Sequence, residues 1–179
     1  MTCFDELGWS ATTIADIRER SGASTGSIYH HFGDKEGIAA ALYAETLRSY
    51  REALGERLDR TRTAKGLVRA LVLHHIEWSV EHRTERALPP RDARERGVRQ
   101  TETVSRASTR AFLEEMFARL KGYVEAGEIL ELPHVLYTPL IIGPAQDVVR
   151  HWLRGRIDRD IRTLARPLAD AAWRALRAE

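Results

Sequence analysis

The sequence predicts an all-α fold, with an N-terminal helix-turn-helix unit followed by a longer helical domain. The chain has 179 residues, 43% of them hydrophobic, which is enough apolar material for a core. Only 6 Pro and 12 Gly interrupt it, and good helix formers are abundant. Apolar residues recur at helical spacing, and no alternating strand pattern competes. We therefore expect a domain over residues 1–45 and a second over residues 46–179.

The first predicted helix of the helix-turn-helix unit begins after Thr13, whose side chain is suited to an N-cap. Ile14 and Ile17 fall on one side of this helix and are expected to face inward. The helix is expected to end at Ser21-Gly22, because glycine favours the left-handed conformation that follows a helix C-terminus.

A second helix is predicted from Thr25 to His31, with Ser24 as its N-cap. Ile28 and Phe32 lie four residues apart and are expected to face inward, with His31 partly buried. This leaves an outward face of hydroxyls, a phenol and an imidazole, which suits base edges and phosphates in a major groove, while a glycine allows close approach. That face consists of Thr25, Gly26, Ser27, Tyr29 and His30.

Asp34 is suited to cap a third helix, whose first residue, Lys35, is expected to place an ammonium group beside a phosphate. Apolar residues at helical spacing extend this helix to about residue 60. Two short helices joined by a glycine-centred turn and followed by a third helix are the layout of a DNA-reading element.

The run T-x-x-x-I-x-x-x-S-G-x-S-x-G-S-I-Y-H-H-F-x-D-K-E, over residues 13–36, resembles the DNA-binding domain of TetR-type transcriptional regulators. The resemblance covers about the first 45 residues. It implies an all-helical homodimer that binds double-stranded operator DNA until a small molecule releases it, most often as a repressor. It also favours Tyr29 and Lys35 as contacts to the DNA backbone. The expected DNA-binding residues are Thr13, Ser24, Thr25, Gly26, Ser27, Tyr29, His30 and Lys35.

The charge of the N-terminal unit opposes simple attraction to DNA. Residues 1–45 contain three basic and seven acidic residues, a formal net charge of −4, whereas the whole chain carries +2. Residues 2–8 resemble only the last turns of a first helix. We therefore expect the native or ancestral chain to begin upstream of Met1, where further basic residues would lie.

The remaining helices follow from apolar spacing and from breakers. Residues 66–82 are apolar on most sides and predict a central helix. Leu88-Pro89-Pro90 is expected to end that region, and the charged residues 91–103 predict a loop or a frayed helix. Further helices are predicted over 105–125, over 132–154 with breaks at Pro139 and Gly143-Pro144, and over 158–178.

The last two predicted helices are the expected homodimer surface. They carry more apolar side chains than a thin helical domain needs, and the resemblance implies a four-helix bundle between subunits. The alternative is that these residues only close the core of one subunit. The residues are Tyr137, Leu140, Ile141, Val148, Val149, Trp152 and Leu153.

Aromatic and histidine side chains in the second domain suggest a ligand pocket for an apolar or aromatic molecule without strong charge. Each of them has an alternative role as ordinary core, because aromatic residues at helical spacing usually pack interiors. The expected ligand-binding residues are His75, Trp78, His82, Phe112, Met116, Tyr137 and Trp152, with Tyr123, His134 and His151 as further candidates.

Metal, cofactor and catalytic sites are not expected. His30 and His31 are adjacent on a helix and point about 100° apart, so they do not share an ion. The histidines and glutamates of residues 74–82 lack a compact zinc spacing. The sequence has no glycine-rich phosphate loop and no nucleophile motif, so we expect a protein that is not an enzyme.

The single cysteine, Cys3, excludes an internal disulfide and favours a reducing, cytoplasmic location. No apolar run is long enough to cross a membrane. Two functions remain open: a ligand-responsive transcriptional regulator, or a helical small-molecule-binding protein whose short, acidic DNA-binding element no longer works.

Overall fold

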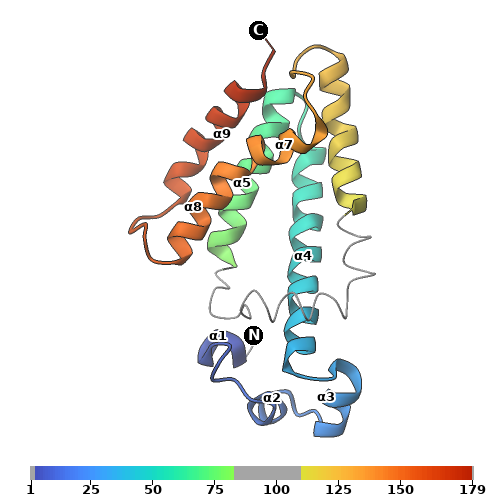
Figure 1. The fold of residues 1–179 in the computed structure, drawn as a ribbon, viewed down its shortest axis with the longest axis vertical. Helices are drawn as coiled ribbons and strands as arrows, with labels where there is room; N and C mark the ends of the chain where they lie inside the picture. Colours follow the sequence, from blue (N-terminus) through green and yellow to red (C-terminus); the bar gives the residue numbers. More distant parts are fainter. Residues whose placement is uncertain (1–2, 83–109, 179) are drawn as a thin grey trace. The chain divides into compact units, whose positions relative to one another are not determined.

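The computed structural model describes residues 3–82 and 110–178, and the regular structure within these ranges is helical, as predicted (Figure 1). One isolated bridge joins Ile129 and Arg177. A further helix occupies residues 110–125. The named helices are α1 (Cys3–Leu7), α2 (Ile14–Ser21), α3 (Thr25–Phe32), α4 (Lys35–Asp59), α5 (Ala64–Glu81), α7 (His134–Ile141), α8 (Gly143–Leu153) and α9 (Arg162–Leu176).

The chain divides into two compact units. Of the described residues, 3–49 and 110 belong to the first unit, and 50–82 and 111–178 belong to the second. The division falls inside α4, between Ser49 and Tyr50. The predicted boundary after residue 45 also falls within this helix.

The ends of α2 and α3 are set by the capping residues that the sequence predicts. The Thr13 side chain accepts a hydrogen bond from the Asp16 backbone N–H, and the Ser24 side chain accepts one from Ser27. Gly22 follows α2 with φ 68°, in the left-handed region where a side chain would be strained. The short connection between the two helices is therefore encoded locally.

The first unit has a small core formed by Phe4, Ile28 and Ile38, which are at most 8% exposed. Trp9 stacks on Phe4, with ring centroids 5.3 Å apart. Ile14 and Ile17 of α2 pack against this core, as the sequence predicts. The core thus holds α2 and α3 together with very few side chains.

Two predictions for α3 are wrong. Phe32 is 41% exposed and His31 is also exposed, so neither helps to bury the helix. Phe32 is the last residue of α3, and the backbone turns away from the helix at Gly33. Ile28 is therefore the only residue of α3 that is buried.

Gly37, in the first turn of α4, is required by a close approach of backbone. A Cβ added there would lie 1.8 Å from the carbonyl oxygen of Phe32. The Asp34 side chain accepts a hydrogen bond from the Gly37 N–H at 2.7 Å, which is the predicted cap of this helix. The turn from α3 into α4 therefore depends on residues 34 and 37 together.

In the second unit α5 is the central helix, as predicted, and it packs against α7, α8 and α9. The helix over residues 110–125 adds Met116 and Leu120 to the same core. Small residues of α9 let it approach α5 closely. They are Ala165, Ala169 and Ala172, each at most 4% exposed.

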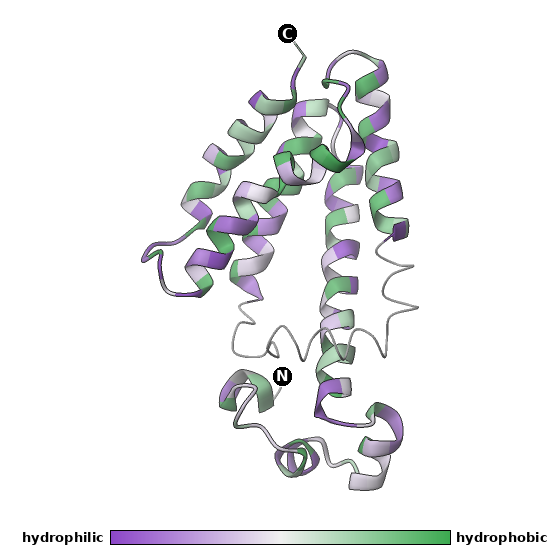
Figure 2. Cartoon of the chain, in the orientation of Figure 1, coloured by the Kyte–Doolittle hydropathy of each residue, from purple (hydrophilic) through white to green (hydrophobic). Residues whose placement is uncertain are grey.

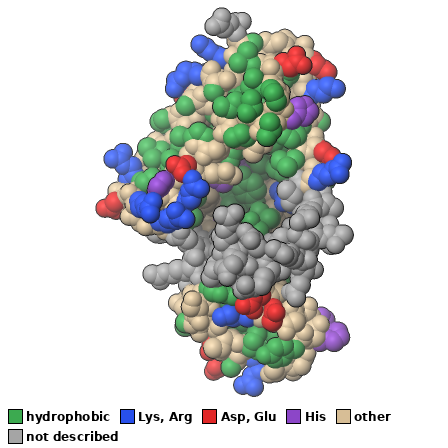
Figure 3. Space-filling view, viewed as in Figure 1, with side chains coloured by type: hydrophobic (Ala, Val, Ile, Leu, Met, Phe, Trp, Pro, Cys, Tyr) green, Lys and Arg blue, Asp and Glu red, His purple; other side chains and the backbone are tan. Residues whose placement is uncertain are grey.

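Hydropathy follows this packing, with apolar and polar faces on the helices of the second unit (Figure 2). Apolar side chains also gather on the face of this unit that Figure 3 shows. Among the exposed large hydrophobic residues, Leu130, Val135 and Leu136 lie in one stretch of sequence, and Val135 is 75% exposed. This unit therefore leaves apolar surface uncovered in the single chain.

The break predicted at Gly143-Pro144 is close to the observed one, whereas the break predicted at Pro139 is wrong, because α7 continues through that residue. α7 contains Pro139 and ends at Ile141, and α8 begins at Gly143, with Pro in its first turn. The last helix begins at Arg162, four residues later than predicted, because the preceding segment forms a turn. The predictions for residues 88–103 and for the start of the helix at residue 105 lie outside the described residues.

No helix within residues 3–82 and 110–178 is long and apolar enough to span a bilayer.

Candidate nucleic-acid interface

The outward face of α3 carries the polar residues that the sequence predicts. Thr25, Gly26, Ser27, Tyr29 and His30 are all exposed, and the Tyr29 side chain is 51% exposed. Ile28 anchors the opposite side of the helix at 4% exposure. This arrangement presents donors and acceptors outward over two turns, as a helix that reads a major groove requires.

The hydroxyl groups of the two N-cap residues, Thr13 and Ser24, differ in whether their proton is available for a hydrogen bond to a partner. The Thr13 hydroxyl accepts from the Asp16 N–H at 3.2 Å and donates to the Asp16 carboxylate at 2.7 Å, so its proton is engaged. The hydroxyl and the backbone N–H of Thr13 both donate to the Asp16 carboxylate and hold its pKa below the ordinary value, with a smaller effect from Arg20. The Ser24 hydroxyl accepts from the Ser27 N–H at 3.1 Å and keeps its proton for another acceptor.

Gly26 is a helical glycine that the fold does not require. A Cβ added there would meet only the Ser24 hydroxyl oxygen, at 4.0 Å, and its φ is not in the left-handed region. Glycine inside a helix costs about 0.5–1 kcal/mol relative to alanine. Nothing among the residues that the structure describes therefore requires glycine here, whereas the close approach of a partner would.

Lys35 does not extend freely into solvent. Its Nζ donates hydrogen bonds to the carbonyl oxygens of Trp9 and Thr12, both at 2.9 Å. The same ammonium lies 4.5 Å from the centroid of the Trp9 ring. The cation expected beside a phosphate is thus held within its own unit.

Arg18 is a cation that the sequence reasoning did not single out. Among the described residues of the first unit, Arg20 pairs with Glu6 at 2.6 Å and Arg48 pairs with Glu45. Arg18 is exposed, and it forms no ion pair with any described residue. Counting charges along the sequence could not separate this available cation from the engaged ones.

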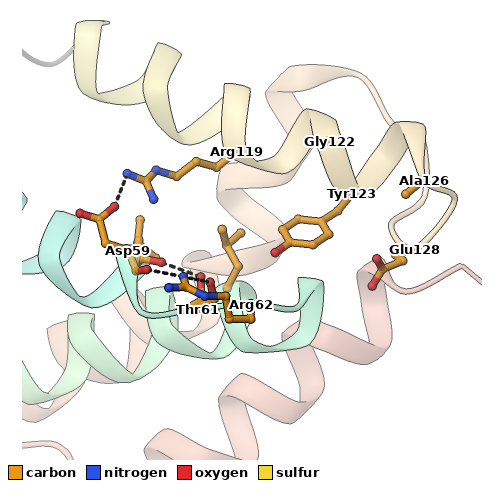
Figure 4. Close-up of a pocket in the computed structure, with 10 residues that line it drawn as sticks. Asp59, Thr61, Arg62, Arg119, Gly122, Tyr123, Ala126 and Glu128 are labelled. Atoms are coloured by element: carbon orange, nitrogen blue, oxygen red, sulfur yellow. Dashed lines mark hydrogen bonds and ion pairs between the residues drawn. The ribbon is translucent and has the colours of Figure 1, made fainter.

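A cavity of about 430 Å³ lies in the second unit, where the end of α4, the turn into α5 and the end of the helix over 110–125 meet (Figure 4). The buried residues Leu58 and Leu67 line it, together with Tyr123. Arg119 donates to Asp59 at its rim at 2.7 Å. Of the predicted candidates, only Tyr123 lines this cavity.

Three of the predicted ligand residues instead gather along α5. The His75 Nδ1 lies 3.4 Å from the Tyr50 hydroxyl, and the Trp78 and His82 rings stack 3.6 Å apart. Burial lowers the pKa of His75 to about 4, helped by the nearby His74, and raises the pKa of Tyr50 to about 12. Both side chains are therefore neutral at physiological pH.

The other predicted ligand residues take part in packing. Met116 and Tyr137 are buried in the core of the second unit, and Phe112 and Trp152 pack against it. The Tyr137 hydroxyl donates to the Leu130 carbonyl at 2.9 Å and accepts from the Leu132 N–H at 3.1 Å. That hydroxyl fixes the turn before α7, and its hydrogen bonds are made within the fold.

A family model described as "Bacterial regulatory proteins, tetR family" matches residues 1–42. The chain is 36% identical over 69 residues to the HTH-type transcriptional regulator BetI of Stenotrophomonas maltophilia, covering 38% of this chain and 35% of that protein. It is 38% identical over 71 residues to the HTH-type transcriptional repressor KstR2 of Rhodococcus jostii, covering 37% of this chain and 35% of that protein. These matches span about a third of the relatives' length, and both relatives are named as regulators of transcription.

Solved structures are similar over nearly the whole chain. The transcriptional regulator FadR from Bacillus subtilis, in complex with stearoyl-CoA, has a TM-score of 0.71 at 19% identity and covers 93% of this chain and 90% of its own. The ketosteroid transcriptional regulator KstR2 of Mycobacterium tuberculosis has a TM-score of 0.71 at 22% identity. The similarity covers 98% of this chain and 90% of that protein. At these identities the likeness establishes the fold. The match over α1 to α3 and the start of α4 shows that the N-terminal unit is similar to the tetR family of bacterial regulatory proteins.

Proposed function

We propose that the protein is a DNA-binding regulator of transcription that acts as a repressor in the cytoplasm and binds a palindromic operator as a homodimer. The observation that carries this proposal is α3 itself. It is a capped helix with one buried residue and a fully exposed polar face. Within the described part of the first unit, no packing requires those side chains, whereas base edges and phosphates match them chemically.

The residues proposed to contact DNA are those on and beside α3. Ser24, Thr25, Gly26, Ser27 and His30 would face the groove, and Thr13 and Tyr29 would face phosphates. The Thr13 hydroxyl and backbone N–H both donate to the Asp16 carboxylate, so the methyl group of Thr13 would be the contacting part. Arg18 is added as a phosphate contact because it is exposed and unpaired among the described residues.

Homodimerisation through α8 and α9 is proposed from the apolar side chains that these helices leave half-buried. Tyr137, Ile141 and Val149, which the sequence reasoning assigned to this surface, are buried within the single chain. The remaining half-buried residues are Val148, Trp152 and Leu153 on α8, and Leu164, Leu168 and Trp173 on α9. Two recognition helices about 34 Å apart would read successive turns of one face of DNA.

A small apolar or aromatic effector is proposed to release the operator by favouring a different spacing of the two DNA-binding units. Two relatives support a ligand-responsive second unit: FadR was solved with stearoyl-CoA, and KstR2 is named as a ketosteroid regulator. The cavity beside Tyr123 is also lined by Leu58 and Leu67, which suit the hydrophobic part of such a molecule.

The alternative is a helical small-molecule-binding protein without DNA-binding activity. It is favoured by the scarcity of available cations, since Arg20 and Lys35 are engaged within the first unit. A mobility-shift titration of the protein against the DNA upstream of its own gene, at low salt and with the dimer confirmed by light scattering, separates the two functions. A specific shift supports the regulator, and a dimer that shifts neither this DNA nor a random duplex supports the alternative.

A further inference from the structure

We infer that Lys35 is a positioning residue, which fixes the turn between α1 and α2 against the start of α4, and that it is not a phosphate ligand. The geometry that leads to this inference does not depend on the proposed function. Its consequence for operator affinity does rest on that function, so the test has one arm without DNA and one arm with it.

The Lys35 ammonium group makes two hydrogen bonds and one aromatic-ring contact within the first unit. A lysine ammonium has three donors, and two of them point to the carbonyl oxygens of Trp9 and Thr12 at 2.9 Å. The Trp9 ring face, 4.5 Å away, is an attractive neighbour for the remaining positive charge. A phosphate would have to draw the group away from these partners, and Lys35 is already half-buried.

The segment that Lys35 holds is a turn outside α1 and α2, closed by a backbone hydrogen bond from the Thr12 N–H to the Gly8 carbonyl oxygen at 3.2 Å. Thr12, at 1% exposure, donates its hydroxyl proton toward the carbonyl oxygens of Gly8 at 2.8 Å and Cys3 at 3.2 Å. Its own carbonyl is the one that accepts from Lys35. Two successive bridges thus connect α1, the turn and the first residue of α4.

The bridge determines where α2 begins. Thr13, the N-cap of α2, directly follows the carbonyl that Lys35 holds, and α2 packs against α3. A displacement of this turn would therefore change the direction of α2 and, through it, the tilt of α3. Lys35 acts on DNA recognition through the α1–α2 turn, over 23 to 26 residues of sequence separation.

The arm without DNA is a spectrum of the lysine side chains. The chain has only three lysines, Lys35, Lys65 and Lys121, so their signals are easily assigned. Lys65 and Lys121 are exposed, so their ammonium protons exchange rapidly with water. In a nitrogen-15 spectrum of the side-chain ammonium groups, we expect one slowly exchanging signal, and Lys35→Met should abolish it while Lys65→Met leaves it in place. A spectrum without a protected signal at low temperature, or one abolished by Lys65→Met, would overturn the inference.

The arm with DNA measures the salt dependence of binding for the full-length wild type and for Lys35→Met. If Lys35 only positions the turn, the slope of log K against log salt stays the same, while affinity for the operator falls about tenfold or more and affinity for a random duplex changes little. If Lys35 is a phosphate ligand, the slope weakens by about 0.9 and both DNAs lose affinity alike. The latter result contradicts the inference.

A general loss of stability must be separated from positioning. Phe4→Leu weakens the same small core without removing the bridge, because Phe4 lies under Trp9. At a temperature where circular dichroism finds every variant folded, Lys35→Met should lower the ratio of operator to random-duplex affinity and Phe4→Leu should not. An equal loss of that ratio in both variants would reduce Lys35 to an ordinary structural residue. If no variant and no wild type binds either DNA, the proposed function fails, and the ammonium spectrum still decides the geometry.

Discussion

Helices α3 and α5 differ in the share of their residues that is buried. α5 buries eight of its eighteen residues and makes the core of the second unit, whereas α3 buries one of eight. A helix with so little packing is normally marginal, yet α3 has an ordered cap at Ser24 and a defined end at Gly33. The contrast indicates that α3 is held in place so that its exposed face can be used. Mutations in the two helices should therefore separate stability from recognition.

The largest effect is expected from Leu71→Ala in α5. Leu71 is 1% exposed, and removing its side chain leaves a cavity, which costs about 2–5 kcal/mol of unfolding free energy. Urea unfolding followed by circular dichroism measures this loss. Operator affinity per folded molecule should stay unchanged, so a parallel loss of affinity in the folded protein would show that α5 also serves recognition.

A pH-dependent loss is expected from His75, on the same helix. Its pKa is about 4 in the folded chain and 6.5 as the ordinary value, because burial disfavours the charged ring. The unfolded chain therefore takes up a proton first as pH falls, so stability is unaffected above pH 6.5 and declines below it. Between pH 7 and pH 5 this one group should remove about 2 kcal/mol. Unfolding titrations at both pH values should show the difference between wild type and His75→Phe, and equal losses in the two proteins would refute the assignment.

Thr25→Ala, on α3, is expected to change base preference and to leave stability almost unchanged. Thr25 is exposed at the start of the helix, so Thr25→Ala should change the unfolding free energy by less than about 0.5 kcal/mol. Loss of a hydroxyl contact to a base should cost about 1 kcal/mol of operator affinity and relax the preference at one base pair. Binding measured across a set of single-base operator variants tests this. Uniform weakening on every sequence would assign Thr25 to the backbone instead.

A small change in stability is expected from Gly26→Ala, for which stability and operator affinity should change in opposite directions. Gly26→Ala should raise the unfolding free energy by about 0.5–1 kcal/mol, because the added methyl group meets only the Ser24 hydroxyl oxygen at 4.0 Å and helical glycine is costly. The same methyl group should weaken operator binding if DNA approaches the backbone there. Thermal melts and mobility shifts on one preparation provide both readings. Improved stability with unchanged binding would mean that no partner comes close to this turn of α3.

Much of the N-terminal unit could be predicted because its determinants are local. Thr13, Gly22 and Ser24 act within three or four residues of themselves, and each is found in the role that its residue type favours. Phe32 was misassigned because helical spacing places it beside Ile28 but says nothing of the core's small extent. In so small a core, one inward residue is sufficient.

The role of Lys35 and the position of the cavity lay beyond the sequence for a different reason. The lysine bonds backbone carbonyls 23 and 26 residues away, and a carbonyl has no signature in sequence. The cavity forms where three separate segments meet. The predicted ligand residues are instead large side chains along helices, so all but Tyr123 lie elsewhere. Most of those side chains fill the interior, as aromatic residues commonly do.

The close approach of backbone at Gly37 affects which mutants a genetic screen would recover. Any side chain at that position would collide with the Phe32 carbonyl, so its replacement should disturb the junction between α3 and α4. In a screen for mutants that no longer silence a reporter, substitutions at Gly37 and at Gly26 would be recovered side by side and look alike. Cellular protein abundance would tell them apart, since the first lesion exposes the polypeptide to proteolysis and the second leaves an abundant but inactive repressor.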